Sequence, residues 1–192
     1  ENIVALDGIA LCVDSGNALP GLTSGQVADI FTGRITNWAD LNGVDTPIVV
    51  VGREAGSGTR SVFEKQFGIA DRCTYANEVD STGAVMARVA STPGAIGYVS
   101  TDIFFLEDVS ASEDLPPRGG GIRDRLRLLA LDGVEPDVQN IESNAYPLYR
   151  PFVMATRGEI CAQNRLVQEW FAYVGGEEGR GIVKRAGLIV PE

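Results

Sequence analysis

Short apolar runs alternate with amphipathic stretches along most of this 192-residue chain. Residues 8–13 and 47–51 are continuous apolar runs, and the second is rich in β-branched side chains, as buried strands tend to be. Residues 95–99 follow a Pro-Gly turn and predict a further strand. Two more strands are expected at residues 126–131 and 152–155.

Segments with helical periodicity separate these strands. After Thr23, whose hydroxyl can cap a helix, apolar residues recur at i, i+3 and i+4 and predict a helix that ends at Gly33. Three further helices are predicted at residues 57–67, 82–90 and 162–174. Strands that alternate with helices indicate an α/β fold, with a mainly parallel mixed sheet flanked by helices.

Between residues 107 and 125 the chain is rich in acidic residues, then prolines, then glycines, which predicts an exposed loop. No apolar run approaches the length needed to cross a bilayer. The chain opens on Glu1 and Asn2, without the basic and apolar stretches of a signal peptide. A mature or trimmed product and a cytoplasmic protein both fit this beginning.

The formal net charge of −10 argues against nucleic acid as a partner, because phosphate backbones need a basic surface. The same charge repels small anions at long range, so any anion site must rely on short-range donors. An acidic surface that keeps the protein soluble is the simpler explanation of the charge.

Several classes of functional site are excluded by composition. The absence of histidine removes His-based zinc sites, Ser-His-Asp triads and Cys-His dyads. Cys12, Cys73 and Cys161 form no C-x-x-C pair, and fit either one disulfide plus a free thiol or three free thiols. No cofactor or metal is expected. An enzyme is not expected either, because no general base beyond carboxylates is present.

A glycine-rich loop leads from the strand at residues 47–51 into the next helix. A helix N-terminus carries unpaired N–H groups and the positive end of the helix dipole, which suits phosphate, sulfate or carboxylate. Gly58 allows close approach to the backbone, and Ser57 and Thr59 add hydroxyl donors. Arg53 can hold two oxygens at once. The pattern therefore predicts an anion site.

Other interpretations use the same residues. In the simplest, Ser57 only caps the helix, and Arg53 pairs on the surface with Glu54 or Glu64. A Walker A loop is excluded, because no Gly-Lys-Ser/Thr follows at the required spacing. A nucleophile elbow is excluded, because the order is Gly-Ser-Gly rather than G-x-S-x-G and no histidine can act as base.

The loop and other segments resemble the periplasmic phosphate-binding proteins of bacterial phosphate ABC importers. The matching segments, in the family's order, are residues 7–10, 22–23, 30–38, 52–60, 93–99 and 146–151. The resemblance implies a type II periplasmic-binding-protein-like clamshell that binds inorganic phosphate outside the cytoplasm and delivers it to a membrane permease. Residues that match the family's phosphate ligands are Arg53, Ser57, Gly58 and Thr59. Secondary cleft candidates, which an ordinary helix cap also explains, are Ser81, Thr82 and Gly83.

Members of that family begin with a first-lobe segment for which this sequence shows no match before Glu1. In the family, that segment carries an acid that accepts the proton of hydrogen phosphate. We therefore expect residues 5–140 to form the second lobe and residues 141–192 to return toward the first, as its C-terminal remnant. A homodimer or the missing N-terminal segment would then cover exposed apolar surface. The alternative is a non-transport binding, signalling or adhesion module on the same scaffold, with weak or no phosphate binding.

Overall fold

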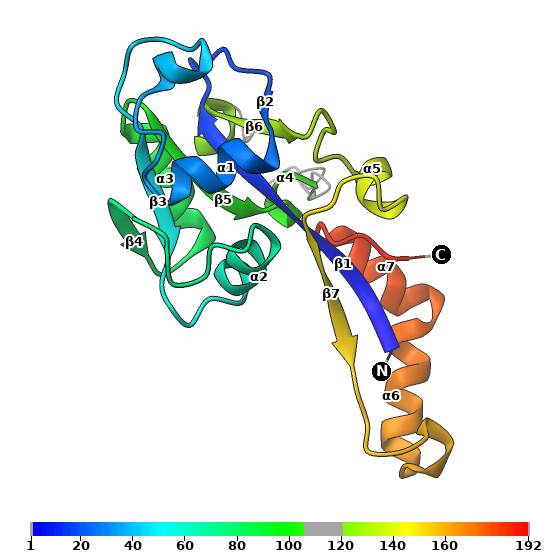
Figure 1. Ribbon diagram of the computed structural model, residues 1–192. Helices are drawn as coiled ribbons and strands as arrows, with labels where there is room; N and C mark the ends of the chain where they lie inside the picture. Colours follow the sequence, from blue (N-terminus) through cyan, green and yellow to red (C-terminus); the bar gives the residue numbers. More distant parts are fainter. Residues whose placement is uncertain (1, 106–120, 192) are drawn as a thin grey trace.

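The computed structural model describes residues 2–105 and 121–191, and Figure 1 shows how the elements are arranged. The strands are β1 (Asn2–Asp14), β2 (Gly21–Leu22), β3 (Val49–Arg53), β4 (Asn77–Val79), β5 (Ala95–Ser100), β6 (Leu126–Leu131) and β7 (Tyr149–Met154). The helices are α1 (Ser24–Phe31), α2 (Gly58–Gln66), α3 (Thr82–Ser91), α4 (Asp102–Phe105), α5 (Val138–Glu142), α6 (Arg165–Gly175) and α7 (Glu177–Arg185). The 3-10 turns are η1 (Trp38–Leu41), η3 (Ile122–Arg125) and η4 (Ile160–Ala162).

Within the described residues one mixed sheet organises the chain, in the order β2-β6-β1-β5-β3-β4, with β7 joined to β1. The predicted α/β fold with a mixed sheet and flanking helices is confirmed. Parallel pairs are β2–β6, β3–β4 and β3–β5, whereas the central β1 is antiparallel to β5, β6 and β7. The expected parallel character therefore holds around β3 but not at the centre. A continuous apolar run shows that both faces of a strand are buried and gives no direction.

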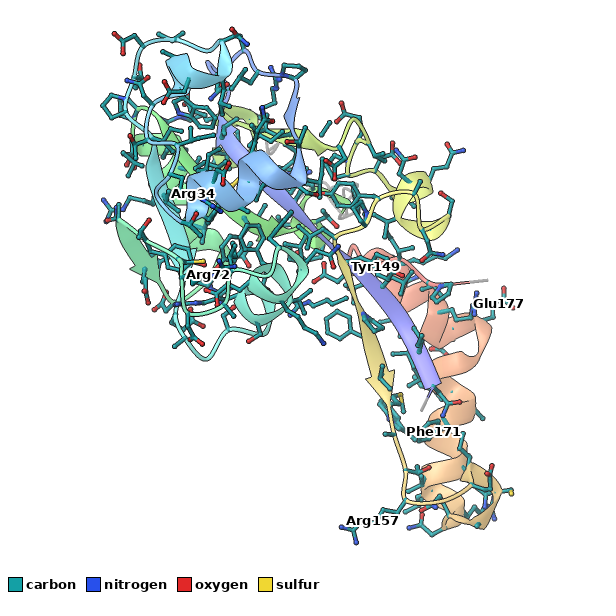
Figure 2. The ribbon with its side chains drawn as sticks, in the orientation of Figure 1. Arg34, Arg72, Tyr149, Arg157, Phe171 and Glu177 are labelled. Carbon is teal, nitrogen blue, oxygen red and sulfur yellow. The ribbon has the colours of Figure 1, made fainter. Side chains whose placement is uncertain are left out.

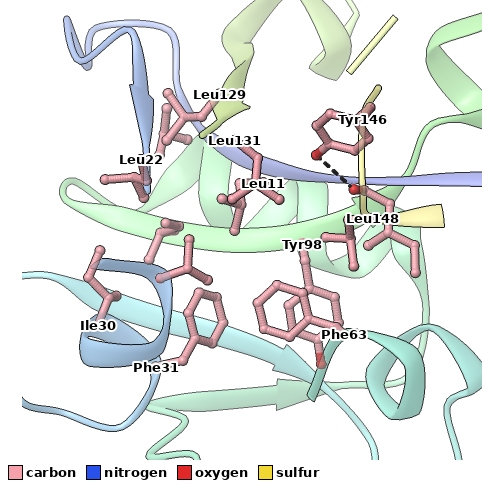
Figure 3. Packing of buried hydrophobic residues seen from close by; sticks show 14 of the residues in the cluster. Leu11, Leu22, Ile30, Phe31, Phe63, Tyr98, Leu129, Leu131, Tyr146 and Leu148 are labelled. Atoms are coloured by element: carbon pink, nitrogen blue, oxygen red, sulfur yellow. Dashed lines mark hydrogen bonds between the residues drawn. The ribbon is translucent and has the colours of Figure 1, made fainter. Parts of the chain in front are cut away.

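The two faces of the main sheet pack against different helices. Ile9 and Leu11 of β1 belong to a cluster with Phe31 of α1 and Phe63 of α2, part of which Figure 3 shows. Cys12 belongs to a second cluster, which contains the buried side chains of α3. Alternate residues of β1 are thus buried on opposite faces, which explains why this part of the strand is an unbroken apolar run.

The strand β1 continues beyond the main sheet. Its first half pairs with β7, from Asn2 opposite Met154 to Gly8 opposite Tyr149, and its second half pairs with β5 and β6. The β1–β7 ribbon projects from the body of the molecule, and α6 and α7 lie along it (Figure 1). Helix α6 has no buried residue. This part of the chain therefore has much less core than the main sheet.

Each strand and helix predicted from the sequence overlaps an observed one, and residues 126–131 match β6 in full. The sequence pattern does not reveal α4, α5, α7, β2 or β4, because most are too short to show a period, and α7 contains two glycines. The predicted loop at residues 107–125 lies outside the described residues, except for Gly121 and η3. Among the described helices, none combines the length and apolarity needed to span a membrane.

Candidate functional site

The predicted anion loop begins where β3 ends, at Arg53, and leads into α2. Ser57 is the N-cap of α2 and is 4% exposed, and its hydroxyl accepts a 3.3 Å hydrogen bond from the backbone N–H of Arg60. Within the described residues the N–H groups of Gly58 and Thr59 make no hydrogen bond, as in the first turn of most helices. The loop therefore presents two free backbone donors at the positive end of the α2 dipole.

The side chain of Arg53 is held in place by its neighbours. Its Nε and Nη2 donate to the two carboxylate oxygens of Glu54 at 3.0 Å each, and Nη2 also donates to the backbone oxygen of Asp80 at 3.2 Å. The hydrogen bonds from Arg53 lower the pKa of Glu54. Nη1 lies 3.4 Å from Oγ1 of Thr82, at the start of α3. The surface pairing with Glu54 thus forms, and it leaves Nη1 with donor capacity for a ligand.

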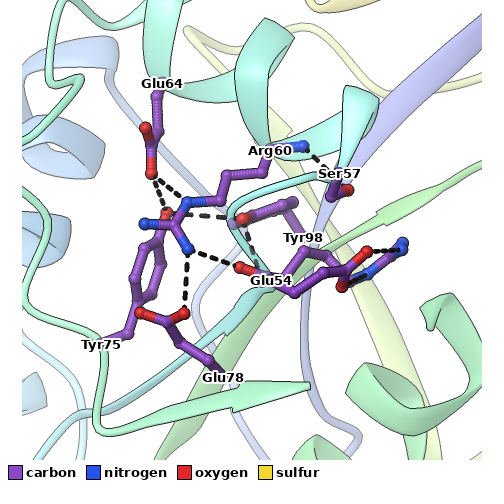
Figure 4. Close-up of polar contacts among 8 residues, drawn as sticks. Glu54, Ser57, Arg60, Glu64, Tyr75, Glu78 and Tyr98 are labelled. Carbon is purple, nitrogen blue, oxygen red and sulfur yellow. Dashed lines mark hydrogen bonds and ion pairs between the residues drawn. The ribbon is translucent and has the colours of Figure 1, made fainter. Parts of the chain in front are cut away.

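A second arginine, Arg60, braces the loop from inside α2 (Figure 4). Its Nη1 donates to the backbone oxygen of Arg53 at 2.7 Å and to Glu78 at 3.0 Å, and its Nε donates to Glu64 at 2.7 Å. Burial alone would lower the pKa of Arg60, but the hydrogen bond to Glu64 and the charge of that carboxylate outweigh burial and raise it. Arg60 is therefore a fixed cation that ties the end of β3 to α2.

Two tyrosines complete the network beneath the loop. The hydroxyl of Tyr98, which is fully buried in β5, accepts a 3.1 Å hydrogen bond from the backbone N–H of Arg53. The hydroxyl of Tyr75 donates to Glu64 at 2.9 Å. A Cβ placed on Gly52 would lie 2.3 Å from the ring of Tyr75. The glycine before Arg53 is therefore required for packing and not for contact with a ligand.

A third arginine reaches the loop from β7. Nε of Arg150 donates to Oδ2 of Asp7 on β1 at 2.8 Å, and Oγ of Ser100 donates to Oδ1 of Asp7 at 2.5 Å. Asp7 is 2% exposed, and burial raises the pKa of its carboxyl, although both hydrogen bonds oppose the rise. A Cβ placed on Gly58 would lie 3.3 Å from Nη1 of Arg150. The guanidinium therefore rests against the first residue of α2.

Of the secondary cleft candidates, Thr82 alone contacts the loop within the described residues, through Arg53. Ser81 is the N-cap of α3 and accepts a 3.2 Å hydrogen bond from the N–H of Ala84, and Gly83 has open space around it. The sequence-based assignment missed Arg60 and Arg150. Arg150 belongs to the segment at residues 146–151 that carries the family resemblance, which was the available signal.

The described ranges contain no group of acidic residues and cysteines that could hold a metal ion. The three cysteines are free: Cys12 is buried, Cys73 is half-buried and Cys161 is exposed. The alternative of one disulfide is therefore not realised in this structure. What the loop offers chemically is a set of N–H and hydroxyl donors, which suits an oxyanion.

Comparison with known proteins points in the same direction. The sequence model of the PBP superfamily domain matches residues 1–178. The phosphate-binding protein PstS of Bacillus subtilis (strain 168) is 30% identical over 190 residues, which are 98% of this chain and 57% of that protein. The chain therefore spans little more than half the length of this relative.

Solved structures are similar over the whole chain. A candidate phosphate ABC transporter substrate-binding protein from Clostridium perfringens, solved with bound phosphate, has 32% identity and a TM-score of 0.78, covering 100% of this chain and 71% of that one. An ABC-type phosphate transport receptor from Vibrio cholerae has 27% identity and a TM-score of 0.79, covering 99% of this chain and 72% of that one.

Proposed function

The chain belongs to the PBP superfamily, and on that premise we propose that it binds inorganic phosphate as the extracytoplasmic solute-binding component of an ABC importer. The observation that carries the proposal is the first turn of α2, where the free N–H groups of Gly58 and Thr59 lie beside arginine side chains. The names of the relatives support the same ligand, and one of them was solved with phosphate bound.

Each loop residue has its own role in this proposal. Gly58 is exposed and supplies a backbone N–H without a side chain in the way, and Thr59 supplies a second N–H and a hydroxyl. The hydroxyl of Ser57 accepts from the backbone of α2 and can still donate its own proton to the ligand. Arg53 adds charge through Nη1, which Thr82 helps to direct.

The proposed activity is binding and transfer to a membrane permease, not catalysis. Four carboxylates beside the loop are engaged with arginines: Glu54 with Arg53, Glu64 and Glu78 with Arg60, and Asp7 with Arg150. None of these carboxylates is free to act as a general base, and the chain contains no histidine. The net charge of −10 argues against nucleic acid as a partner.

The proposal also divides the chain into two parts. Residues 5–140 form the lobe that carries the anion loop, and residues 141–192 belong to the other lobe, with β1 passing between them. Residues 141–192 carry exposed apolar side chains, which supports a face that another polypeptide covers: Trp170 is 57% exposed and Phe152 is 38% exposed. A second copy of the chain or further polypeptide of a longer protein would cover this face.

The test is calorimetric titration of the chain with inorganic phosphate and with sulfate. The proposed donors all lie in one segment, residues 53–59, so we expect weak binding, with a dissociation constant of about 1 mM. Arg53→Ala should weaken phosphate binding by about 1.5–3 kcal/mol, the usual value of a hydrogen bond to a charged group.

Arg34→Ala is the matched control, because Arg34 forms a surface pair with Asp29 at 2.8 Å and its side chain is 64% exposed. It lies on the main body of the molecule, in a different segment from the loop (Figure 2). Phosphate binding by Arg53→Ala equal to that of Arg34→Ala would show that Arg53 only forms a surface pair. No heat of binding for the unaltered chain would favour the non-transport module instead.

A further inference from the structure

Arg150 links β1 and β7, and the same side chain also reaches the first turn of α2. Asp7 and Arg150 lie opposite each other in the β1–β7 pairing, and their side chains form an ion pair of 2.8 Å. The carboxylate of Asp7 is buried and is also bound by Ser100 of β5. Three strands therefore hold the Nε side of the Arg150 guanidinium in one place.

The other side of the same guanidinium faces helix α2. Nη1 of Arg150 would lie only 3.3 Å from a Cβ on Gly58, so it sits beside the free N–H groups of the first turn. Within the described residues neither Nη1 nor Nη2 makes a hydrogen bond. Asp7 balances the charge of Arg150 but binds only its Nε. The geometry therefore places guanidinium donors and backbone N–H donors side by side, where one oxyanion could accept from both.

We infer that Arg150 is a second arginine of the anion site, with Nη1 donating to the oxyanion that the first turn of α2 binds and Asp7 fixing its direction. The inference rests on the proposed function at α2 and extends it. Arg53 reaches the loop from the end of β3, whereas Arg150 reaches it from β7. Two guanidinium groups on one ligand favour a doubly charged tetrahedral oxyanion over a singly charged one.

The experiment is calorimetric titration with inorganic phosphate of variants at two arginines. Arg150 lies in β7, and Arg157 lies in the turn that follows it. Arg150→Gln should weaken phosphate binding at least tenfold. Arg157→Gln removes the same charge from an exposed residue at the far tip of the ribbon and should leave the affinity within twofold (Figure 2). Asp7→Asn should weaken binding less than Arg150→Gln, because Asp7 only positions the guanidinium.

Two further measurements distinguish a loss of phosphate binding from a loss of folding. Arg150→Lys keeps a positive charge for Asp7 but has no second branch to reach the ligand, so it should retain the thermal midpoint and lose affinity. Phenylglyoxal labelling of the unaltered chain, read by mass spectrometry, should show that phosphate protects Arg150 and not Arg157.

These outcomes separate the inference from the proposed function. Wild-type affinity in a folded Arg150→Lys variant, or equal labelling of Arg150 with and without phosphate, would overturn the role of Arg150 and leave the loop site standing. Failure of the unaltered chain to bind phosphate would overturn both.

Discussion

The ion pair between Arg60 and Glu64 should contribute far more to folding stability than a surface pair of the same geometry. Arg60–Glu64 in α2 and Arg165–Glu169 in α6 both join residues four apart at 2.7 Å, and both begin in the first turn of a helix. Their exposure differs, because the side chains are 18% and 11% exposed in the first pair and 90% and 54% exposed in the second.

The expected magnitudes follow from that difference. Removing one partner of a buried ion pair costs about 3–5 kcal/mol, because the other charge loses its compensation. Arg60→Ala leaves Glu64, which is 8% exposed, with the Tyr75 hydroxyl as a donor, and it also removes the hydrogen bond to the backbone of Arg53. Some contact with water remains, so we expect about 3 kcal/mol. Arg165→Ala should cost about 0.3–0.5 kcal/mol, as exposed pairs do.

Thermal unfolding followed by circular dichroism measures both variants. For a chain of this length, 1 kcal/mol shifts the melting temperature by about 2–4 °C, so Arg60→Ala should lower it by roughly 6–12 °C and Arg165→Ala by less than about 2 °C. Replacing arginine by alanine changes helix propensity little and equally in the two helices. Equal losses in the two variants would refute the reasoning that burial sets the strength of the Arg60 network.

Two further predictions concern the thiols and the apolar face of α6. Burial raises the pKa of Cys12 to about 12, so only on the order of 10⁻⁴ of it is thiolate at pH 8. A thiol reagent should therefore modify the exposed Cys161 first and Cys12 only after denaturation, and fast native labelling of Cys12 would contradict its place in β1. Because Leu166 is 76% exposed and Trp170 57%, light scattering after size-exclusion chromatography should detect a dimer that Trp170→Ser weakens. A monomer at every concentration would show that this face does not drive self-association.

The longer strands of the main sheet could be predicted because most of their residues are buried, whereas the short edge strands β2 and β4 could not. The run at residues 8–13 marks the part of β1 that lies inside the sheet, and the run at residues 126–131 coincides with β6. Residues 3–6 of β1 are apolar too, but the first part of the strand lies in the β1–β7 ribbon, where Asn2 and Ile3 remain exposed. Local periodicity contains no information about such a partner, which joins β1 from the other end of the chain.

The candidate site also has a part that local sequence predicts and a part that depends on distant segments. The donors of the α2 turn could be predicted, because glycine spacing and a following helix are local features. The ion pair of Asp7 and Arg150 joins positions 143 residues apart, so no spacing rule indicates it. Arg60 has the i, i+4 spacing to Glu64 that a surface pair would have. Its hydrogen bond to the backbone oxygen of Arg53, which makes it part of the loop's support, depends on how α2 packs against the end of β3.

The charges around the loop bear on how an acidic chain would hold the proposed anion. Arg53, Arg60 and Arg150 are balanced by the carboxylates that bind them, so the loop carries no excess positive charge to attract a ligand from a distance. The ion pairs instead fix the orientation of the guanidinium groups. Glu54 binds Nε and Nη2 of Arg53 and leaves donor capacity at Nη1, and Asp7 binds only Nε of Arg150. Arg60 holds the backbone oxygen of Arg53. Affinity at such a site depends on donors that are already oriented before the anion arrives, because reorienting a long side chain costs conformational entropy.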